Sequence, residues 1–240
     1  AFNGGAIAVV SCSNILINST NTFTGNWARN NGGTIYSDGV NKLSLEGTEN
    51  NMLNITGSKA INGGAIFVNN TLLTINYATL TYNNATLSGG AIYFNNTKGA
   101  VLRNMIMDFN SAYYGGAIFG NVATNITISG TQNNRYRKNN ATYGGVFFFK
   151  DSDNISVINA SFSEDEAVYA GVIYINNTNA TIKSSNFTDN NVSADGGAIY
   201  VNITSKLSIV DSNFINNTAL NGGAIYFNDP DVNITTSNFD

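Results

Sequence analysis

Apolar residues in this chain recur at every second position, in short segments separated by polar and turn-forming residues. Ile199–Val201, with the sequence IYV, and residues 207–209, with the sequence LSI, are two examples. Glycine, asparagine, aspartate or serine bounds each segment. Alternation with period two is typical of strands with one buried face, and no window carries a useful helical period. The pattern therefore predicts an all-β protein built from many short strands.

The segments are organised by a repeat. A Gly-Gly or Ala-Gly pair recurs along the whole chain, and five of the eight intervals between successive pairs are 26 residues long. Each interval holds three strand segments, too few to close a core alone, so stacking of successive units is required. We predict a right-handed parallel β-helix of about nine rungs of about 26 residues, with three short strands per rung. The pairs begin at Gly4, Gly32, Gly63, Gly89, Gly115, Gly144, Ala170, Gly196 and Gly222.

The repeat also predicts which side chains face inward. The residue two places after the second glycine, Ile199 in the eighth unit, and the residue two places later, Val201, share one face of a strand and should line the core. The small residue before Ile199 and the aromatic Tyr200 after it should face outward. The glycines fit a tight corner, where φ is positive or where stacked backbones approach closely.

A second motif links the end of each unit to the next. Phe187 and Asn190, in an F-x-x-N arrangement, precede the Gly196 pair, and Phe214 and Asn217 precede the Gly222 pair. Phe23 with Asn26 fits the motif, Phe162 with Asp165 is a weaker copy, and Leu80 and Tyr136 replace the phenylalanine in two other units.

The combination of F-x-x-N and GGAI resembles the repeats of the chlamydial polymorphic outer-membrane proteins, within the wider pectate-lyase-like β-helix superfamily. The resemblance covers essentially the whole chain, residues 1–240, which we expect to be a single array. It implies a parallel β-helix at a cell surface, as in adhesins and autotransporter passengers. The chain begins three residues before its first glycine pair and stops inside a unit, so we expect the array to continue, covalently or by head-to-tail stacking.

Composition narrows the possible functions. Charged residues are only 11% of the chain, and 11 Lys and Arg stand against 15 Asp and Glu, so no basic surface for nucleic acid is expected. Histidine is absent, which excludes histidine catalysis and histidine-bound metals. No apolar run approaches the ~18–20 residues of a membrane span. Cys12 is alone and is expected to be a small buried residue, and no cofactor is expected.

Asparagine is the most prominent residue type, with 43 copies, and it admits two interpretations. Asparagines such as Asn190 and Asn217 can hydrogen-bond the backbone and stack on their copies as a ladder. Alternatively, Asn-x-Ser/Thr sequons carry N-linked glycans, particularly Asn69, Asn95, Asn176 and Asn202 at the exit of the first strand. Neighbouring rungs are too close for every stacked sequon to be occupied, so we expect partial use. The sixteen sequons are Asn18, Asn54, Asn69, Asn84, Asn95, Asn125, Asn140, Asn154, Asn159, Asn176, Asn179, Asn186, Asn191, Asn202, Asn216 and Asn233.

An aromatic residue occupies the same outward register in eight units. Stacked at about 4.8 Å, these rings form a stripe along the rod, which either stabilises the sheet or serves as a docking surface for sugar or another rod. The stripe consists of Tyr36, Phe67, Tyr93, Phe119, Phe148, Tyr174, Tyr200 and Tyr226.

Few residues suggest catalysis. The acidic groups Asp151, Asp153, Glu164, Asp165, Glu166, Asp229 and Asp231 are expected in solvated turns, although a carbohydrate enzyme or a calcium site could be built from such groups. The basic cluster RYRK at residues 135–138 is expected in an exposed loop, with contact to an anionic glycan as the alternative.

The sequence thus favours a non-catalytic, secreted, glycosylated β-helix segment of a cell-surface or filament-forming protein. Its expected partners are copies of itself and covalent N-glycans, with carbohydrate as a further candidate. Two alternatives remain open: an adhesin that binds glycans or cells, and a polysaccharide lyase or hydrolase of the pectate-lyase-like superfamily.

Overall fold

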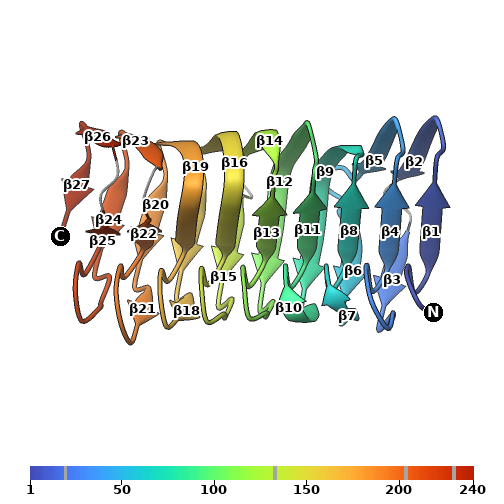
Figure 1. Cartoon of the computed structure of the whole chain (residues 1–240), viewed down its shortest axis with the longest axis horizontal. Coiled ribbons are helices and arrows are strands. Elements are labelled where there is room, and N and C mark those ends of the chain that lie inside the picture. Colours follow the sequence, from blue (N-terminus) through green and yellow to red (C-terminus); the bar gives the residue numbers. More distant parts are fainter. Residues whose placement is uncertain (19–20, 132–133, 203–204, 229–230) are drawn as a thin grey trace.

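A computed structural model describes residues 1–18, 21–131, 134–202, 205–228 and 231–240. The described residues contain strands and no helix, and parallel pairing joins each strand to its copies in neighbouring rungs. Figure 1 shows the chain rising along the front, crossing over the top and returning behind as it advances from the N-terminus to the C-terminus, which is a right-handed coil. The parallel β-helix predicted from the repeat is confirmed.

Each rung contributes one strand to each of three parallel sheets. The first sheet contains β1 (Ile7–Val10), β4 (Ile35–Asp38), β8 (Ile66–Asn69), β11 (Ile92–Asn95), β13 (Ile118–Asn121), the beginnings of β16 (Phe147–Ile158) and β19 (Ile173–Lys183), β22 (Ile199–Val201) and β25 (Ile225–Phe227). These nine positions, counted over the described residues, correspond to the nine expected rungs.

The other two sheets complete the coil. The second contains β2 (Asn14–Asn18), β5 (Lys42–Glu46), the beginnings of β9 (Leu72–Thr81) and β12 (Ala100–Asp108), β14 (Thr124–Ser129), the ends of β16 and β19, β23 (Lys206–Val210) and β26 (Asp231–Thr235). The third contains β3 (Thr22–Thr24), β6 (Leu53–Thr56), the ends of β9 and β12, β15 (Arg135–Arg137), β17 (Ser161–Ser163), β20 (Asn186–Thr188), β24 (Asn213–Ile215) and β27 (Asn238–Phe239).

A short turn segment connects the third strand of each rung to the first strand of the next. Two pairs of short parallel strands form there, β7 (Lys59–Asn62) with β10 (Asn84–Ser88), and β18 (Glu166–Ala167) with β21 (Asn191–Val192). Isolated parallel bridges link the same segment in several other rungs.

The glycine pairs form the corner that leads into the first sheet. The first glycine has positive φ, for example +73° at Gly196, a conformation that residues with a Cβ rarely adopt. The second glycine has no room for a side chain, because a Cβ on Gly197 would collide with the backbone oxygen of Gly223 in the next rung. Both expected reasons for the glycine pair are confirmed.

The core of the helix is lined by the predicted inward register. Ile66, Ile92 and Ile199 have no exposed surface, and successive residues of this register lie directly opposite each other in neighbouring strands. The prediction for the small residue before the isoleucine is wrong: Ala65 is fully buried within the main core. Its N–H and that of Ile66 both donate to the carbonyl of Ala91, so the chain still bends at Ala65 and the period-two alternation begins only afterwards.

Candidate functional site

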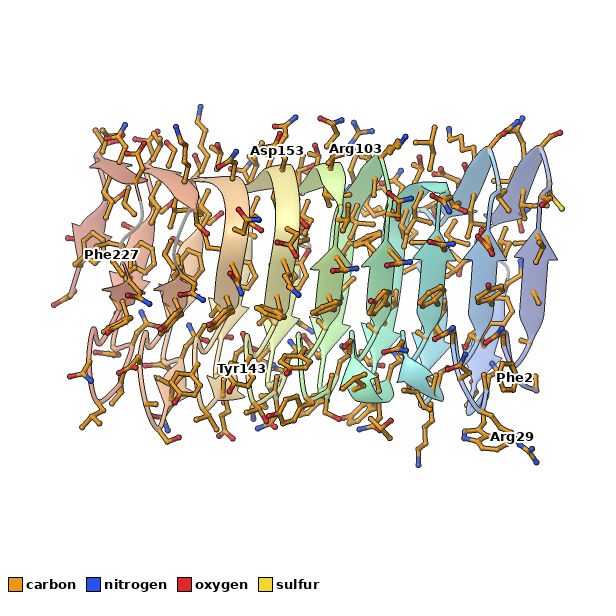
Figure 2. The ribbon with its side chains drawn as sticks, in the orientation of Figure 1. Phe2, Arg29, Arg103, Tyr143, Asp153 and Phe227 are labelled. Carbon is orange, nitrogen blue, oxygen red and sulfur yellow. The ribbon has the colours of Figure 1, made fainter. Side chains whose placement is uncertain are left out.

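The predicted aromatic stripe lies on the outer face of the first sheet, outside the main core, and most of its rings stack on one another. The ring centroids of Tyr36 and Phe67 are 5.5 Å apart, and those of Phe67 and Tyr93 are 5.0 Å apart, with interplanar angles of 9° and 16°. Tyr174 and Tyr200 are also parallel, at 4.7 Å and 4°. Figure 2 shows this row of rings crossing the front of the molecule. Four of the rings, Phe67, Phe119, Phe148 and Tyr174, are buried, and the other four are half-buried.

The stacking is interrupted in the middle of the stripe. Phe119 and Phe148 are tilted by 48°, and Phe148 meets Tyr174 edge-on at 71°. A second column, formed by the residues just before the glycine pairs, packs there: Tyr114 stacks on Phe148 and Tyr143 meets Tyr174 edge-on.

This second column, Tyr114, Tyr143 and Tyr169, is not among the residues predicted from the repeat. The signal was present, because all three tyrosines directly precede the Gly115, Gly144 and Ala170 pairs. Together with Phe119, Phe148 and Tyr174 they form a hydrophobic cluster separate from the main core. Burial raises the pKa of the Tyr174 hydroxyl far above its ordinary value, and the neighbouring tyrosines add to this effect.

An open groove, here called the aromatic groove, follows this cluster. It has a volume of about 500 Å³, and its apolar lining includes Tyr114, Tyr143 and Phe148. Asn121, Lys150 and Asn176 border it at the exit of the first strand. The groove therefore places amides, phenol hydroxyls and one ammonium group around an apolar floor. Figure 2 shows Tyr143 below the row of rings, near the turn segment.

The asparagines at the exit of the first strand form an outer ladder. Nδ2 of Asn69 donates to Asp38 at 2.7 Å, Nδ2 of Asn95 donates to Asn69 at 2.8 Å, and Nδ2 of Asn121 donates to Asn95 at 3.1 Å. The sequence predicts glycans on Asn69 and Asn95. A glycan on Nδ2 of either residue would lie within this ladder, one rung from the other residue's sequon. Their glycosylation stays a prediction.

The sixteen sequons differ in the exposure of the asparagine and in its hydrogen bonds. Asn18, Asn125, Asn140, Asn154, Asn159, Asn179, Asn186, Asn191, Asn216 and Asn233 are exposed, and Asn54, Asn69, Asn84, Asn95, Asn176 and Asn202 are half-buried. Nδ2 of Asn154 donates to Asn125 at 2.7 Å, so these two sequons also stack on neighbouring rungs. The Ser and Thr residues that complete the sequons of Asn18 and Asn202 lie outside the described residues.

An inner amide ladder accounts for the asparagine of F-x-x-N. Asn190 donates from its backbone N–H and from Nδ2 to Oδ1 of Asn217, at 3.2 and 2.8 Å, and Nδ2 of Asn217 donates to the Phe187 carbonyl. The predicted structural ladder is therefore confirmed for these two residues. The phenylalanine of the motif forms a parallel stack beside it, with the rings of Phe187 and Phe214 4.6 Å apart.

Asp165 takes the ladder position in the weaker copy of the motif. The prediction that it lies in a solvated turn is wrong, because it is completely buried. Its Oδ1 accepts hydrogen bonds from the backbone and side chain of Asn139, while Oδ2 has no partner among the described residues. Burial raises the pKa of the Asp165 carboxyl well above its usual range, and the hydrogen bonds from Asn139 oppose only part of this rise.

The RYRK cluster is not a loop, which corrects the prediction. Residues Arg135–Arg137 form β15, and the Tyr136 ring is fully buried in the inner aromatic stack against Phe162. The period-two rule explains this, because Arg135 and Arg137 then point outward together. Arg135 forms an ion pair with the nearly buried Asp108 at 2.5 Å.

Of the other acidic residues that were expected in solvated turns, five are exposed: Asp151, Asp153, Glu164, Glu166 and Asp231. Asp153 and Arg103 project from the upper edge of the coil (Figure 2). Asp151 and Asp153 accept hydrogen bonds from Asn177 and Asn179 of the next rung. Asp229 lies outside the described residues, and within the described ranges no group of three His, Cys, Asp or Glu could hold a metal. Cys12 is half-buried near the N-terminal end.

The fold and its ladders define a parallel β-helix repeat protein. A sequence model of the Chlamydia polymorphic membrane protein repeat matches three segments, residues 22–38, 184–202 and 211–228. These three segments are therefore similar to the repeats of that family. Searches of curated proteins and of solved structures gave no significant match. Among the described residues, no helix has the length and hydrophobicity of a membrane span.

Proposed function

We propose that this chain is a section of a non-catalytic, extracellular rod that is displayed at the cell surface or built into a filament, and that it carries N-linked glycans. The observation that carries the proposal is the repetition of the same side-chain ladders from rung to rung. The inner amide ladder, the inner aromatic stack and the outer aromatic stripe all run parallel to the rod axis. The repeats of a surface-protein family support the proposed location.

The ladders suit a structural role because they add contacts along the axis. The backbone hydrogen bonds of every sheet also run along this axis, from one rung to the next. Pulling the ends apart would therefore load many hydrogen bonds and stacked pairs at once. A rod of this kind holds whatever it presents at a defined distance from the cell.

Surface exposure tests this function directly. Intact cells that produce the protein are treated with an impermeant protease or labelled with antibodies to this chain, and electron micrographs are examined for rods or fibres. We expect cleavage or labelling without cell lysis. Protection of the chain in intact cells, together with its release only after lysis, would contradict the proposal.

Adhesion to glycans is a second candidate, favoured by the aromatic groove. Binding sites commonly combine an apolar floor with a few convergent polar groups. In the groove, Tyr143 contributes the floor, while Lys150 and Asn176 border it. We expect purified protein to bind immobilised cell-surface glycans saturably and Tyr143→Ala and Lys150→Ala to weaken that binding. Lys42→Ala, which removes an exposed lysine elsewhere, is the matched control, and equal binding by all variants would reject the groove as the site.

A further inference from the structure

One register of the turn segment places sequons on alternate rungs. Parallel bridges join Asn84 to Ser111, Ser111 to Asn140 and Asn140 to Glu166, and β18 pairs Glu166 with Asn191. Asn84, Asn140 and Asn191 each begin a sequon, whereas Ser111 and Glu166 do not. Three sequons are therefore aligned along the rod axis, and the rung between each pair has no sequon in this register.

The spacing of this row fits a bulky modification. Neighbouring strands lie about 4.8 Å apart, so sequons on alternate rungs are separated by about 9.6 Å. A glycan is bulky and must extend into solvent from its asparagine. Two glycans on adjacent rungs compete for the same space. Two glycans on alternate rungs are separated by one further rung and have twice the spacing.

The surroundings of the row are open. Asn84, Asn140 and Asn191 line a groove of about 730 Å³ that follows the turn segments, and small residues such as Ala85 and Ala141 lie between the polar positions. Asn140 and Asn191 are exposed, and their side-chain amides make no hydrogen bond within the described part of the chain. Nδ2 of Asn84 donates to the Ser111 hydroxyl at 2.6 Å, and a glycosylated amide keeps one N–H that can maintain this bond.

Other registers place sequons on consecutive rungs. Asn69 and Asn95 are directly opposite in β8 and β11 and are joined by a hydrogen bond. Asn125 and Asn154 are joined in the same way in the second sheet. At these positions two glycans would stand on adjacent rungs, about 4.8 Å apart, and would compete for the same space.

We propose that Asn84, Asn140 and Asn191 form a row of N-glycan attachment sites on alternate rungs, and that folded molecules do not carry glycans on both members of a stacked pair such as Asn69 and Asn95. The inference rests on the proposed extracellular location. The donor is a lipid-diphosphate-linked oligosaccharide. Nδ2 forms a bond to C1 of the first sugar, the bond from C1 to the diphosphate oxygen breaks, the lipid diphosphate leaves, and one amide proton passes to solvent.

The second part of the proposal requires that sugar is transferred to the chain before the rungs close, so that folding discriminates between the glycosylated forms. A molecule that carries glycans on both members of a stacked pair has to fit both glycans into the width of one rung, about 4.8 Å, when the pair stacks. The folded, secreted population is thereby enriched in molecules whose glycans occupy open or alternate positions.

Glycopeptide and intact-mass spectrometry of the secreted, folded protein tests the row. The full chain is produced in cells that have the N-glycosylation machinery, and we expect sugar on Asn84, Asn140 and Asn191. Thr86→Ala, Thr142→Ala and Ser193→Ala should each remove the mass of one glycan. Absence of sugar from all three asparagines, or molecules with sugar on both Asn69 and Asn95, would overturn the inference.

A double variant tests the spacing itself. Ser111→Asn with Tyr113→Thr creates a sequon between Asn84 and Asn140, and we expect any molecule with sugar there to lack it on both neighbours. Ser111→Asn with Tyr113→Ala is the control, because it also removes the tyrosine ring but creates no sequon. Sugar on residue 111 together with sugar on Asn84 or Asn140 in one folded molecule would overturn the spacing argument. Surface exposure is measured by protease treatment independently of sugar, so an exposed but unglycosylated chain rejects this inference and not the surface location.

Discussion

The backbone N–H and the side-chain Nδ2 of Asn139 both donate to Oδ1 of Asp165, at 2.8 and 3.1 Å, inside the coil. The same pair of bonds joins Asn110 to Asn139 one rung earlier. There, Nδ2 of Asn139 also donates to the carbonyl of Met107. Oδ2 of Asp165 occupies the position of such a nitrogen and has no partner among the described residues. A proton on this oxygen lets the carboxyl act as a donor, as the amides of the ladder do.

Stability should therefore depend on pH through Asp165. Burial raises the pKa of this carboxyl in the folded state, with nearby Asp108 and Glu164 adding to the rise, while in the unfolded chain the pKa is ordinary, about 3.9. The folded protein then binds more protons than the unfolded chain above about pH 4. The stabilisation that protonated Asp165 provides is complete below about pH 4. It is lost as the pH rises through the raised pKa of Asp165 in the folded protein.

Asp165→Asn should remove this dependence and stabilise the protein at neutral pH by about 1–3 kcal/mol, because the ladder regains its donor without a buried charge. Urea unfolding of the wild type and the variant at several pH values measures the difference. Glu166→Gln, which changes an exposed neighbouring carboxyl, is the control. Parallel pH profiles for the wild type and Asp165→Asn would show that Asp165 is not the responsible group.

The inner amide ladder should contribute strongly to stability. Asn139→Ala removes the acceptor of the Asn110 backbone N–H and the donor to the Met107 carbonyl, which leaves buried polar groups unpaired. Each unpaired group costs about 1–3 kcal/mol. Asn140→Ala changes the adjacent, exposed asparagine and should cost less than about 0.5 kcal/mol. Denaturation of unglycosylated protein compares the two, and equal losses would rule out a special role for the inner ladder.

The glycine corners should be more sensitive to close approach than to backbone angle. Gly90→Ala places a methyl group against the backbone oxygen of Gly116 and should cost more than about 4 kcal/mol or prevent folding. Gly25→Ala, in the turn after β3, strains the backbone instead, because φ there is +65°, but a Cβ meets nothing within 4 Å. Its cost should be about 1–2 kcal/mol. Melting temperatures in the reverse order would contradict this explanation of the repeat.

Within the outer aromatic stripe, the rings around Phe148, where the parallel stacking is interrupted, should contribute most to the stability of the fold. Phe148 contacts Tyr114, Phe119 and Tyr174, whereas Tyr36 at the end of the stripe stacks only on Phe67 among the described rings. Phe148→Ala should cost about 3–5 kcal/mol, and Tyr36→Ala clearly less. Urea unfolding measures both variants. A small loss at Phe148 would favour a docking role over rung-to-rung stacking for these rings.

Much of the fold was predictable because the same residue types recur at the same positions in each unit. Period-two alternation indicated the strands, and the glycine pairs indicated the corners. The F-x-x-N motif indicated the ladder of Asn190 and Asn217. In these cases the residue type and its position in the repeat were sufficient to predict the local structure.

Other features depended on where the coil bends and on which rungs become neighbours. Ala65 is buried because the corner delays the alternation, and Tyr143 joins the stripe because a turn residue lies beside a strand residue of another rung. Sequence alone determined the repeating unit, its stacking and the inventory of sequons. Only the tertiary structure decided that Asp165 is buried with no partner for its Oδ2 among the described residues, and that Asn84, Asn140 and Asn191 share one open row. Burial and spacing are properties of stacked rungs and not of a single unit.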